Sequence, residues 1–431
     1  MNIIWALIVF SLVVIIHEFG HFLLARRGGI KVLEFSLGMG PRLFSFPAMG
    51  TKFSLKLLPL GGSCLMEGED GNSADPDAFS NKSVWTRMAV VVAGPFFNFI
   101  LAFILSLFVI GFAGVDFPTV TSVTTGYPAA EAGIMSGDRI TSFAGRKIFI
   151  GRDLSNYLSF HQITDKAIPV TYVRDGVKYE TEILPKQIEI YQVGFSYMQT
   201  EQAAEIVSIA EGGALAETEA AVGDQIIEIN GVDITTGTGL AAYLQEHPLD
   251  GSALEMTLKR GEETISITLN PKYIATSYNI GMGYNLARTR VGVLQTVLYS
   301  LNETRYWITS TIESLKQIIL GKVSADDIAG PVGIVQMIGQ TYEQSRTEGL
   351  LMVLLNMANI SILISANLGV MNLLPIPALD GGRLIFLIIE AIRGKQIDPD
   401  KEGMVHLIGF ALLMVLMVFI FYHDIMRILG R

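Results

Sequence analysis

This sequence of 431 residues has one cysteine, few charged side chains and no basic residue ahead of its first apolar stretch. Cys64 has no possible partner within the chain, so no internal disulfide holds any part of it together. Charged residues make up 17% of the chain and hydrophobic residues 50%, which is typical of a membrane protein with sizeable soluble parts. Without a basic start or a small-residue cleavage site, the first apolar stretch does not resemble a cleavable signal, and we expect it to stay attached.

Four apolar segments are long enough to cross a bilayer as helices. Lys and Arg gather between the first and second segments and between the third and fourth, so both loops are expected to be cytoplasmic. Both termini and the long stretch between the second and third segments then face the other side. The expected spans are 1–25, 88–113, 351–373 and 404–422, and the expected cytoplasmic loops are 26–87 and 374–403.

The long external stretch is acidic. From Asp116 to Arg290 it carries 22 acidic and 13 basic side chains, or about −9 of the total charge of −10. Nothing in the chain resembles a surface that binds nucleic acid, and the lipid bilayer is the partner that the composition indicates.

The motif HEFGH, from His17 to His21, lies inside the first apolar run. As a helix, the run from Ile3 to Ala25 would be about 35 Å long. The helical period places His17 and His21 one turn apart on one face with Glu18 beside them, the arrangement in which two imidazoles bind zinc and a carboxylate handles the attacking water. Snorkelling of both histidines to an interface is the alternative, but Arg26 lies about 14 Å along the helix from His17. Because ionisable groups in a spanning helix are usually functional, the motif predicts a zinc site within the membrane.

A catalytic zinc site needs a third protein ligand, and Asp380 in NLLPIPALDGG is the best candidate. Pro375 and Pro377 are expected to break the third span near its cytoplasmic end, and such a break is tolerated where it lines a protein cavity. An ordinary Asp-Gly turn outside the membrane is the alternative. Of the other histidines, His406 and His423 are expected at the interfaces of the last span, and His161 and His247 in the external stretch. We expect neither pair to reach a site at His17.

The external stretch contains an internal repeat. A shift of 86 residues aligns Gly137-Asp138-Arg139-Ile140 with Gly223-Asp224-Gln225-Ile226, and Arg174 with Arg260. A repeat of this length predicts two copies of a small domain, at 116–200 and 201–290. The copies resemble the permuted bacterial PDZ pattern, in which a peptide adds a strand at a sheet edge. Val193-Gly194-Phe195 and Ile280-Gly281-Met282 are the candidate binding loops, and domains that act only as spacers or gates are the alternative.

These motifs together resemble the site-2 protease family of intramembrane zinc metalloproteases, with the domain order of its Gram-negative, sigma-factor-regulating members. The similarity covers nearly the whole chain, and AGPFFNF (Ala93 to Phe99) adds to it. It implies four transmembrane helices, a membrane-reentrant β element between the first two, and two PDZ domains. It also implies an inner-membrane protein with periplasmic PDZ domains and termini, and an active site toward the cytoplasm.

The resemblance also implies roles for particular residues. His17, His21 and Asp380 would bind Zn²⁺, Glu18 would be the general base, and Asn372 would position the substrate backbone or the developing oxyanion. The substrates would be single-span membrane proteins of the anti-sigma-factor type, already trimmed by another protease, and remnant signal peptides. We further expect an unwound substrate to pair with the alternating strand that contains Thr51, Phe53, Ser54, Leu55 and Leu57.

Two other functions compete with proteolysis. A non-catalytic membrane-anchored PDZ scaffold would have no need for all of His17, Glu18, His21 and Asp380. A transporter would explain the polar residues of the third span, such as Asn356 and Asn367, although these also suit helix–helix contacts. In the linker region 300–350, residues 301–320 form an amphipathic pattern that suits either the outer membrane surface or packing against the PDZ domains.

Overall fold

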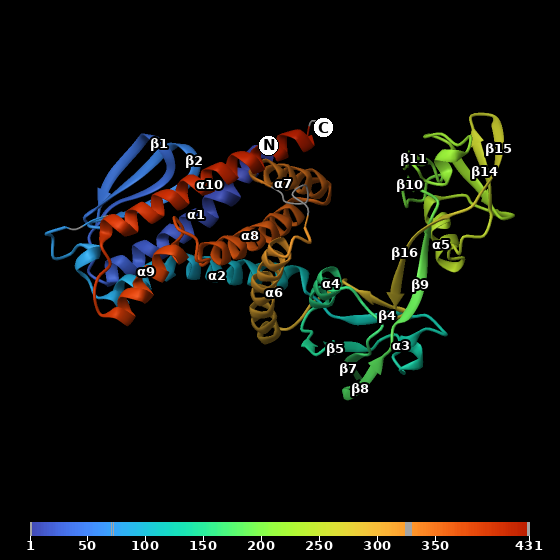
Figure 1. Ribbon diagram of the computed structural model, residues 1–431, viewed down its shortest axis with the longest axis horizontal. Coiled ribbons are helices and arrows are strands. Elements are labelled where there is room, and N and C mark those ends of the chain that lie inside the picture. Colours follow the sequence, from blue (N-terminus) through green and yellow to red (C-terminus); the bar gives the residue numbers. More distant parts are fainter. Residues whose placement is uncertain (1, 70, 72, 324–329, 429–431) are drawn as a thin grey trace. The chain divides into compact units, whose positions relative to one another are not determined.

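The computed structural model describes residues 2–69, 71, 73–323 and 330–428 (Figure 1). Residues 324–329, within the expected linker region 300–350, lie outside this description. The chain divides into two compact units. The first comprises Met1–Pro118, Ile148–Phe160 and Asn285–Arg431, and the second comprises Thr119–Lys147 and His161–Tyr284.

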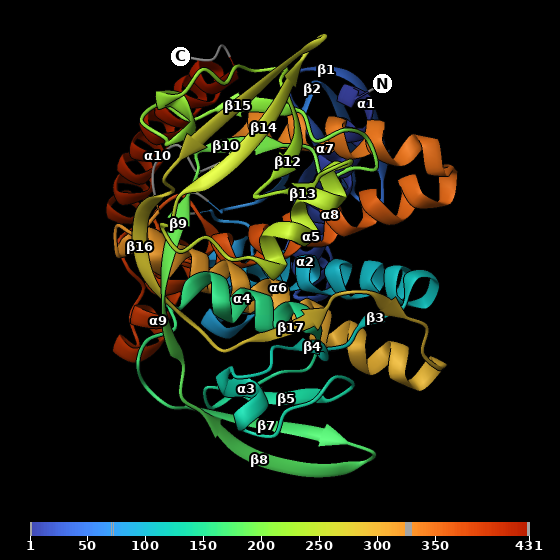
Figure 2. The ribbon, with the colours of Figure 1, turned by 90° about the vertical axis from the view of Figure 1, so that its right-hand side faces the viewer.

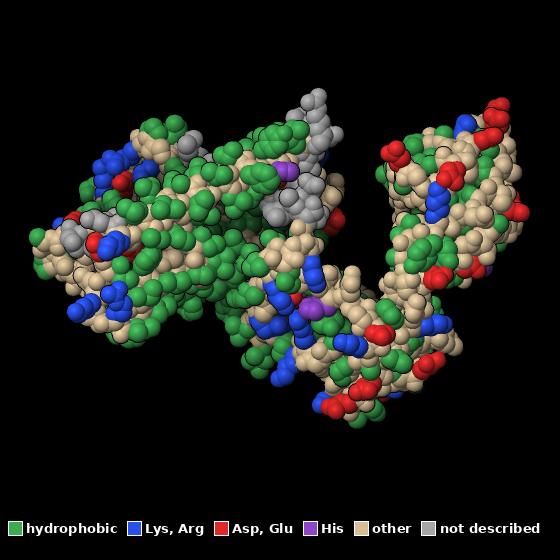
Figure 3. Space-filling view, in the orientation of Figure 1, with side chains coloured by type: hydrophobic (Ala, Val, Ile, Leu, Met, Phe, Trp, Pro, Cys, Tyr) green, Lys and Arg blue, Asp and Glu red, His purple; other side chains and the backbone are tan. Residues whose placement is uncertain are grey.

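The first unit is a bundle of long helices with a small sheet (Figure 1). Four helices in the described part of the chain are long and apolar enough to cross a membrane, which agrees with the four expected spans. Hydrophobic side chains cover much of the surface of this bundle (Figure 3). Its elements are α1 (Asn2–Arg27), β1 (Val32–Ala48), β2 (Thr51–Met66), α2 (Val84–Ala113), β3 (Val115–Asp116), α4 (Gly151–Phe160), β18 (Arg288–Thr289), α6 (Val293–Ile319), α7 (Pro331–Ser345), α8 (Leu350–Asn372), α9 (Asp380–Arg393) and α10 (Pro399–Ile428).

Strands β1 and β2 are so strongly bent that each supplies two segments of one sheet. The bends fall at glycines with positive φ, Gly38 and Gly40 in β1 and Gly61 in β2. Segment 51–56 of β2 pairs on one side with 34–37 of β1 and on the other with 42–48. Segment 62–66 pairs only with 32–37 among the described residues, and therefore forms an edge of the sheet.

This register corrects the expected substrate strand. Thr51 and Ser54 are 2% and 8% exposed, and the Thr51 hydroxyl donates a hydrogen bond to the Val32 carbonyl. Phe53 and Leu55 pair with β1 on both sides. The alternation indicated a half-buried strand, and substrate pairing would need a free edge on it. The strand is an inner one, so Thr51–Leu57 has no free backbone edge for a substrate along its paired part.

The second unit consists of two small β-rich domains and a pair of long strands, β9 and β16, which run antiparallel to each other (Figures 1 and 2). One sheet has the order β17-β4-β5-β7-β8, and the other has the order β13-β12-β14-β15. The elements are β4 (Thr119–Val123), α3 (Pro128–Glu131), β5 (Arg139–Phe143), β6 (Arg146–Lys147), β7 (Ile168–Arg174), β8 (Val177–Ile183), β9 (Lys186–Gln192), β10 (Phe195–Tyr197), β11 (Ile206–Ile209), β12 (Gln225–Ile229), β13 (Val232–Asp233), α5 (Gly237–Glu246), β14 (Leu254–Arg260), β15 (Glu263–Leu269), β16 (Lys272–Asn279) and β17 (Met282–Asn285).

The strand order shows that one domain is inserted into the other. Strand β17, which follows the second domain in the sequence, pairs with β4 of the first domain. Its repeat counterpart β10 pairs with β11 of the second domain, although it precedes residue 201. The expected division at 200/201 therefore separates strands that belong to one sheet, because a boundary drawn along the sequence cannot represent a nested arrangement.

The repeat itself is visible in individual contacts. Arg174 Nε donates to Asp138 Oδ1 at 2.7 Å, and Arg260 Nε donates to Asp224 Oδ1 at the same distance. Both aspartates are almost fully buried. Burial raises the pKa of Asp138, but Arg174 and the Met135 N–H more than offset it, so the pKa is lowered. Arg260 likewise holds the pKa of Asp224 below its ordinary value.

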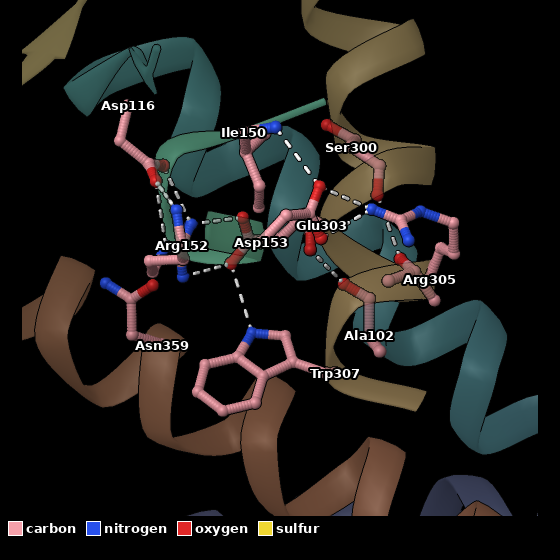
Figure 4. A network of polar contacts seen from close by, with 12 residues as sticks. Ala102, Asp116, Ile150, Arg152, Asp153, Ser300, Glu303, Arg305, Trp307 and Asn359 are labelled. Atoms are coloured by element: carbon pink, nitrogen blue, oxygen red, sulfur yellow. Dashed lines mark hydrogen bonds and ion pairs between the residues drawn. The ribbon is translucent and has the colours of Figure 1, made fainter. Parts of the chain in front are cut away.

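A buried ionic network joins α4 to α6 within the first unit (Figure 4). Arg152 on α4 donates to Asp116 Oδ1 at 3.0 Å and to Glu303 Oε1 at 2.8 Å. Burial by itself lowers the pKa of Arg152, but Glu303 and Asp116 raise it above its ordinary value. Arg305 on α6 pairs with Asp153 at 2.7 Å. Because Asp116 and Glu303 are at most 2% exposed, removal of Arg152 would leave two buried acids without their guanidinium partner.

Helix α6 also contacts α2 and α8, so it packs on the helix bundle of the first unit.

We predict that Asp224→Asn loosens the second β domain at pH 7, because it removes a charged acceptor from the buried pair with Arg260. Such a loss costs about 1–3 kcal/mol, which raises amide hydrogen exchange roughly 5- to 150-fold. Exchange should rise in residues 205–270 and stay unchanged in the first domain, whereas Asp138→Asn should give the reverse pattern. The pH dependence of this contribution follows from the lowered pKa of Asp224 in the folded protein. The stability that the Asp224–Arg260 pair contributes is fully present above the unfolded pKa of about 3.9, and it is lost as the pH falls through the folded pKa. Uniform exchange changes in both domains would contradict two independent pairs.

Candidate metal centre

The metal centre forms where the backbones of α1 and α2 lie in close contact at two glycines. A Cβ atom added to Gly20 would lie 2.4 Å from the Ala93 carbonyl oxygen, and one added to Gly94 would lie 2.2 Å from His21 Nε2. Glycine at both positions is therefore required for the two helix backbones to pack at the level of the histidines. His17 and His21 are each 8% exposed, and helical spacing places both rings on the α2 side of α1.

Three side chains converge at one point between these helices and α9. His17 Nε2 and His21 Nε2 are 3.2 Å apart, and Asp380 Oδ2 lies 3.3 Å from the first and 3.4 Å from the second. Ligand atoms that surround a zinc ion tetrahedrally at about 2.0–2.1 Å lie roughly 3.3–3.4 Å apart. The three atoms thus fit three corners of a zinc coordination sphere, and they are drawn from residues that are buried or partly buried.

The orientation of both rings is set by their other nitrogens. His21 Nδ1 donates to the Val90 carbonyl at 2.9 Å, which leaves its Nε2 lone pair available for a metal. His17 Nδ1 lies 3.2 Å from the side-chain amide of Asn98, which is fully buried. The Asn98 atom facing this nitrogen is Nδ2. Zinc at Nε2 would put the ring hydrogen on Nδ1, and the Asn98 amide would then have to turn its oxygen toward the ring to accept it. The Ser365 hydroxyl of α8 donates to the Asn98 backbone oxygen at 2.8 Å.

Asp380 is brought to the histidines by a broken segment between α8 and α9. Helix α8 ends at Asn372 and α9 begins at Asp380, as the two prolines of NLLPIPALDGG predict. Glycine is required after the aspartate, because a Cβ at Gly381 would lie 2.2 Å from the Leu374 carbonyl oxygen and one at Gly382 would lie 2.4 Å from that of Ile376. Ala378 has a φ of 75°, in the region that favours glycine.

A cavity of about 350 Å³ opens onto this site. Glu18 lines it together with the three converging residues and with segment 62–66 of β2. A Cβ at Gly62 would lie 3.0 Å from Glu18 Cγ, so the edge of the sheet lies directly against the side chain expected to act as the base. The cavity is large enough to admit a length of extended peptide beside Glu18.

The remaining sequence-predicted residues lie apart from this cluster. Asn372 is the last residue of α8, is partly exposed, and is not among the described residues that line the cavity. Thr51, Phe53, Ser54, Leu55 and Leu57 do not line it either, again within the described residues. The sequence analysis did not assign a role to Asn98 or Gly94, although both lie within AGPFFNF. A polar residue and a small residue at helical spacing in an apolar span were the available signal.

Apolar helices that carry three converging ligands and a neighbouring carboxylate define a membrane protein with a metallohydrolase site. The profile of Peptidase family M50 matches residues 5–416, and the chain belongs to this family. It is similar to zinc metalloprotease RasP of Geobacillus kaustophilus, at 30% identity over 99% of this chain and 98% of that protein. The regulator of sigma-W protease RasP of Bacillus subtilis is 30% identical, over 98% and 97% of the two chains. Protease RseP of Yersinia pestis is 29% identical, over 99% and 100%.

Proposed function

We propose that this protein is an intramembrane zinc metalloprotease of the site-2 type, which cleaves membrane-spanning segments of single-span proteins. The proposal rests mainly on one observation. His17 and His21 of the apolar helix α1 converge with Asp380 of α9, and Glu18 lies beside them. The relatives support it through their names, which include zinc metalloprotease and regulator of sigma-W protease. Substrates of the anti-sigma-factor type fit these names, as do remnant signal peptides by family resemblance.

The proposed orientation follows from the charges next to the spans. Lys and Arg between α1 and α2 and between α8 and α10 favour the cytoplasmic side for β1, β2 and the α8–α9 segment. The second unit and both termini then face the periplasm. The metal centre lies toward the proposed cytoplasmic end of α1, because His17 and His21 are in the C-terminal half of that helix.

Each residue of the site has a distinct proposed role in catalysis. His17, His21 and Asp380 hold zinc, with Asn98 and the Val90 carbonyl fixing the two rings. Zinc supplies Lewis acidity that polarises the scissile carbonyl and lowers the pKa of water. Glu18 accepts the proton of the attacking water and returns it to the leaving amine. Asn372, at the break after α8, is proposed to contact the substrate backbone, as the family resemblance implies.

Glu18→Gln should abolish proteolysis while zinc stays bound, because the substitution removes the base and leaves all three ligands. We expect cleavage of a single-span substrate in proteoliposomes to fall by about 10²- to 10⁴-fold, with zinc per chain unchanged by elemental analysis. His21→Ala should lose both zinc and cleavage. A scaffold or a transporter would show no proteolysis that depends on Glu18, and that result would overturn the proposal.

Substrate pairing is proposed at segment 62–66 rather than at 51–57. A helical peptide hides its scissile bonds in its own hydrogen bonds, so it must unwind, and a free strand edge offers replacement partners. Segment 62–66 is such an edge and lines the cavity beside Glu18. The opposite edge of the sheet, 42–48, does not line the cavity among the described residues.

Proline at Ser63 or at Cys64 should test this pairing, because backbone N–H groups alternate along a strand and one of the two points outward. We expect at least one variant to lower kcat/KM about tenfold while zinc content stays normal. Ser45→Pro, on the opposite edge, is the matched control and should have a smaller effect. Wild-type kcat/KM in both Ser63→Pro and Cys64→Pro would rule out pairing at this edge.

The two β domains are proposed to be PDZ domains that screen substrates. In the second domain a pocket of about 360 Å³ lies between β10 and α5, next to Gly194. The loops of both domains match in detail, since Gly194 and Gly281 each accept a backbone hydrogen bond at equivalent positions, from Ala210 and Thr124. The pocket is suited to an extended peptide. We propose separately that the two domains exclude substrates with bulky folded ectodomains by steric clash.

Deletion of Phe117 to Arg288 should make cleavage less dependent on prior trimming of the substrate. The deletion removes Arg152, the guanidinium partner of both Asp116 and Glu303. It is therefore best combined with Asp116→Asn and Glu303→Gln, and these two substitutions in the full chain are the control. We expect the ratio of cleavage rates for trimmed and untrimmed substrate to fall toward one in the deletion variant only. If untrimmed substrate stays uncut while trimmed substrate is cleaved, the screening role is wrong.

A further inference from the structure

The segment that carries Asp380 is held by a histidine of the last helix. The Ala378 N–H donates a hydrogen bond to His406 Nδ1 at 2.8 Å, across 28 residues of sequence. Ala378 stands two residues before Asp380 and has a φ of 75°. This conformation is strained for a non-glycine residue, so it persists only where surrounding contacts enforce it. The hydrogen bond to His406 is one such contact.

A second contact fixes the same segment to the same face of α10. Gly409 lies one helical turn after His406, and a Cβ there would be 2.4 Å from Pro377 Cβ and 2.7 Å from the Pro377 carbonyl oxygen. The α10 backbone therefore packs directly on Pro377 while His406 holds the next residue. This is independent of the hydrogen bond, because it depends on backbone distance alone.

The His406 ring is itself oriented by its neighbours. Its centroid lies 5.7 Å from that of Phe386 on α9, and its Nε2 lies 3.9 Å from Glu402 Oε1, one turn earlier on α10. Since Nδ1 accepts the Ala378 N–H, the hydrogen of the neutral ring resides on Nε2, on the side of Glu402. The ring thus offers an acceptor to the broken segment in a fixed direction.

The rest of α10 is anchored far from this segment. At its other end, Asp424 accepts hydrogen bonds from the backbone N–H groups of Gly330, Val332 and Gly333, at 3.0 to 3.1 Å. Between the two anchors, much of α10 exposes large apolar side chains, including Leu407, Phe410 and Val415. These residues suit lipid contact. Near its start, α10 contacts the broken segment through His406 and Gly409.

We propose that His406 is a positioning residue of the metal centre. By holding Ala378 in its strained conformation, it sets the direction in which Asp380 leaves the broken segment, and so the distance of its carboxylate from the two imidazoles. His406 touches neither substrate nor metal, and it acts through the backbone of residues 378–380. The inference rests on the proposed function for the identity of the metal, but its test does not require proteolysis.

The test measures zinc affinity of the full-length protein in detergent by competition with a chelator. His406→Leu removes the acceptor at similar size and should weaken zinc binding about 10- to 100-fold, as loss of an outer hydrogen bond does at other metal sites. His406→Asn places an oxygen where Nδ1 stood and should remain within about threefold of the wild type. His406→Gln places its oxygen nearer the position of Nε2 and should behave like His406→Leu.

Two further variants separate positioning from a general loosening of α10. Gly409→Ala leaves His406 intact, but its added methyl group would clash with Pro377, so it should also weaken zinc binding. This variant provides the test if His406→Leu does not fold. Asp424→Asn replaces one of the two acceptor oxygens of the distant anchor by an NH₂ donor, and it should leave zinc affinity unchanged. The proposal is overturned if His406→Leu and Gly409→Ala bind zinc as the wild type does, or if Asp424→Asn weakens binding as much as they do. A wild-type protein that binds zinc but cleaves nothing would instead overturn the proposed function alone.

Discussion

The close approach of α1 and α2 at Gly20 and Gly94 is the constraint on which the metal centre depends. Within a bilayer the hydrophobic effect does not drive helices together, so packing between small residues and interhelical hydrogen bonds must do so. Both are present here, since the glycines allow backbone contact and Asn98 joins α2 to His17 on α1 and to Ser365 on α8. A side chain at either glycine would displace the imidazoles from the point at which they meet Asp380.

The third ligand depends on irregular backbone, and irregular backbone needs partners. The segment between α8 and α9 contains two prolines and a residue with positive φ, so it cannot satisfy its own hydrogen bonds as a helix does. Gly381 and Gly382 fold it tightly onto itself, and His406 and Gly409 support it from α10. The same principle applies at the start of α7, where the Asp424 carboxylate accepts three N–H groups that the first turn of a helix leaves free.

The β1–β2 sheet and the nested β domains were harder to predict than the helices. The alternation of Phe53, Leu55 and Leu57 with polar residues correctly indicates a strand, but it does not tell an inner strand from an edge. That distinction comes from the bends at Gly38, Gly40 and Gly61, which let β1 pair on both sides of segment 51–56. Likewise, the 86-residue repeat identified equivalent residues down to Asp138–Arg174 and Asp224–Arg260, yet not the exchange of β17 into the earlier sheet.

The sequence by itself determined the four apolar helices, the helical face shared by His17 and His21 with Glu18 beside them, the break before Asp380 and the repeat. These depend on periodicities and backbone preferences that act over a few residues, so they can be read without a fold. Only the tertiary structure decided that Asp380 lies 3.3 Å from His17, that 62–66 is the strand edge beside Glu18, and that His406 contacts the ligand segment. Such contacts join residues tens to hundreds of positions apart, and their geometry is set by helix packing and chain reversal that no local pattern encodes.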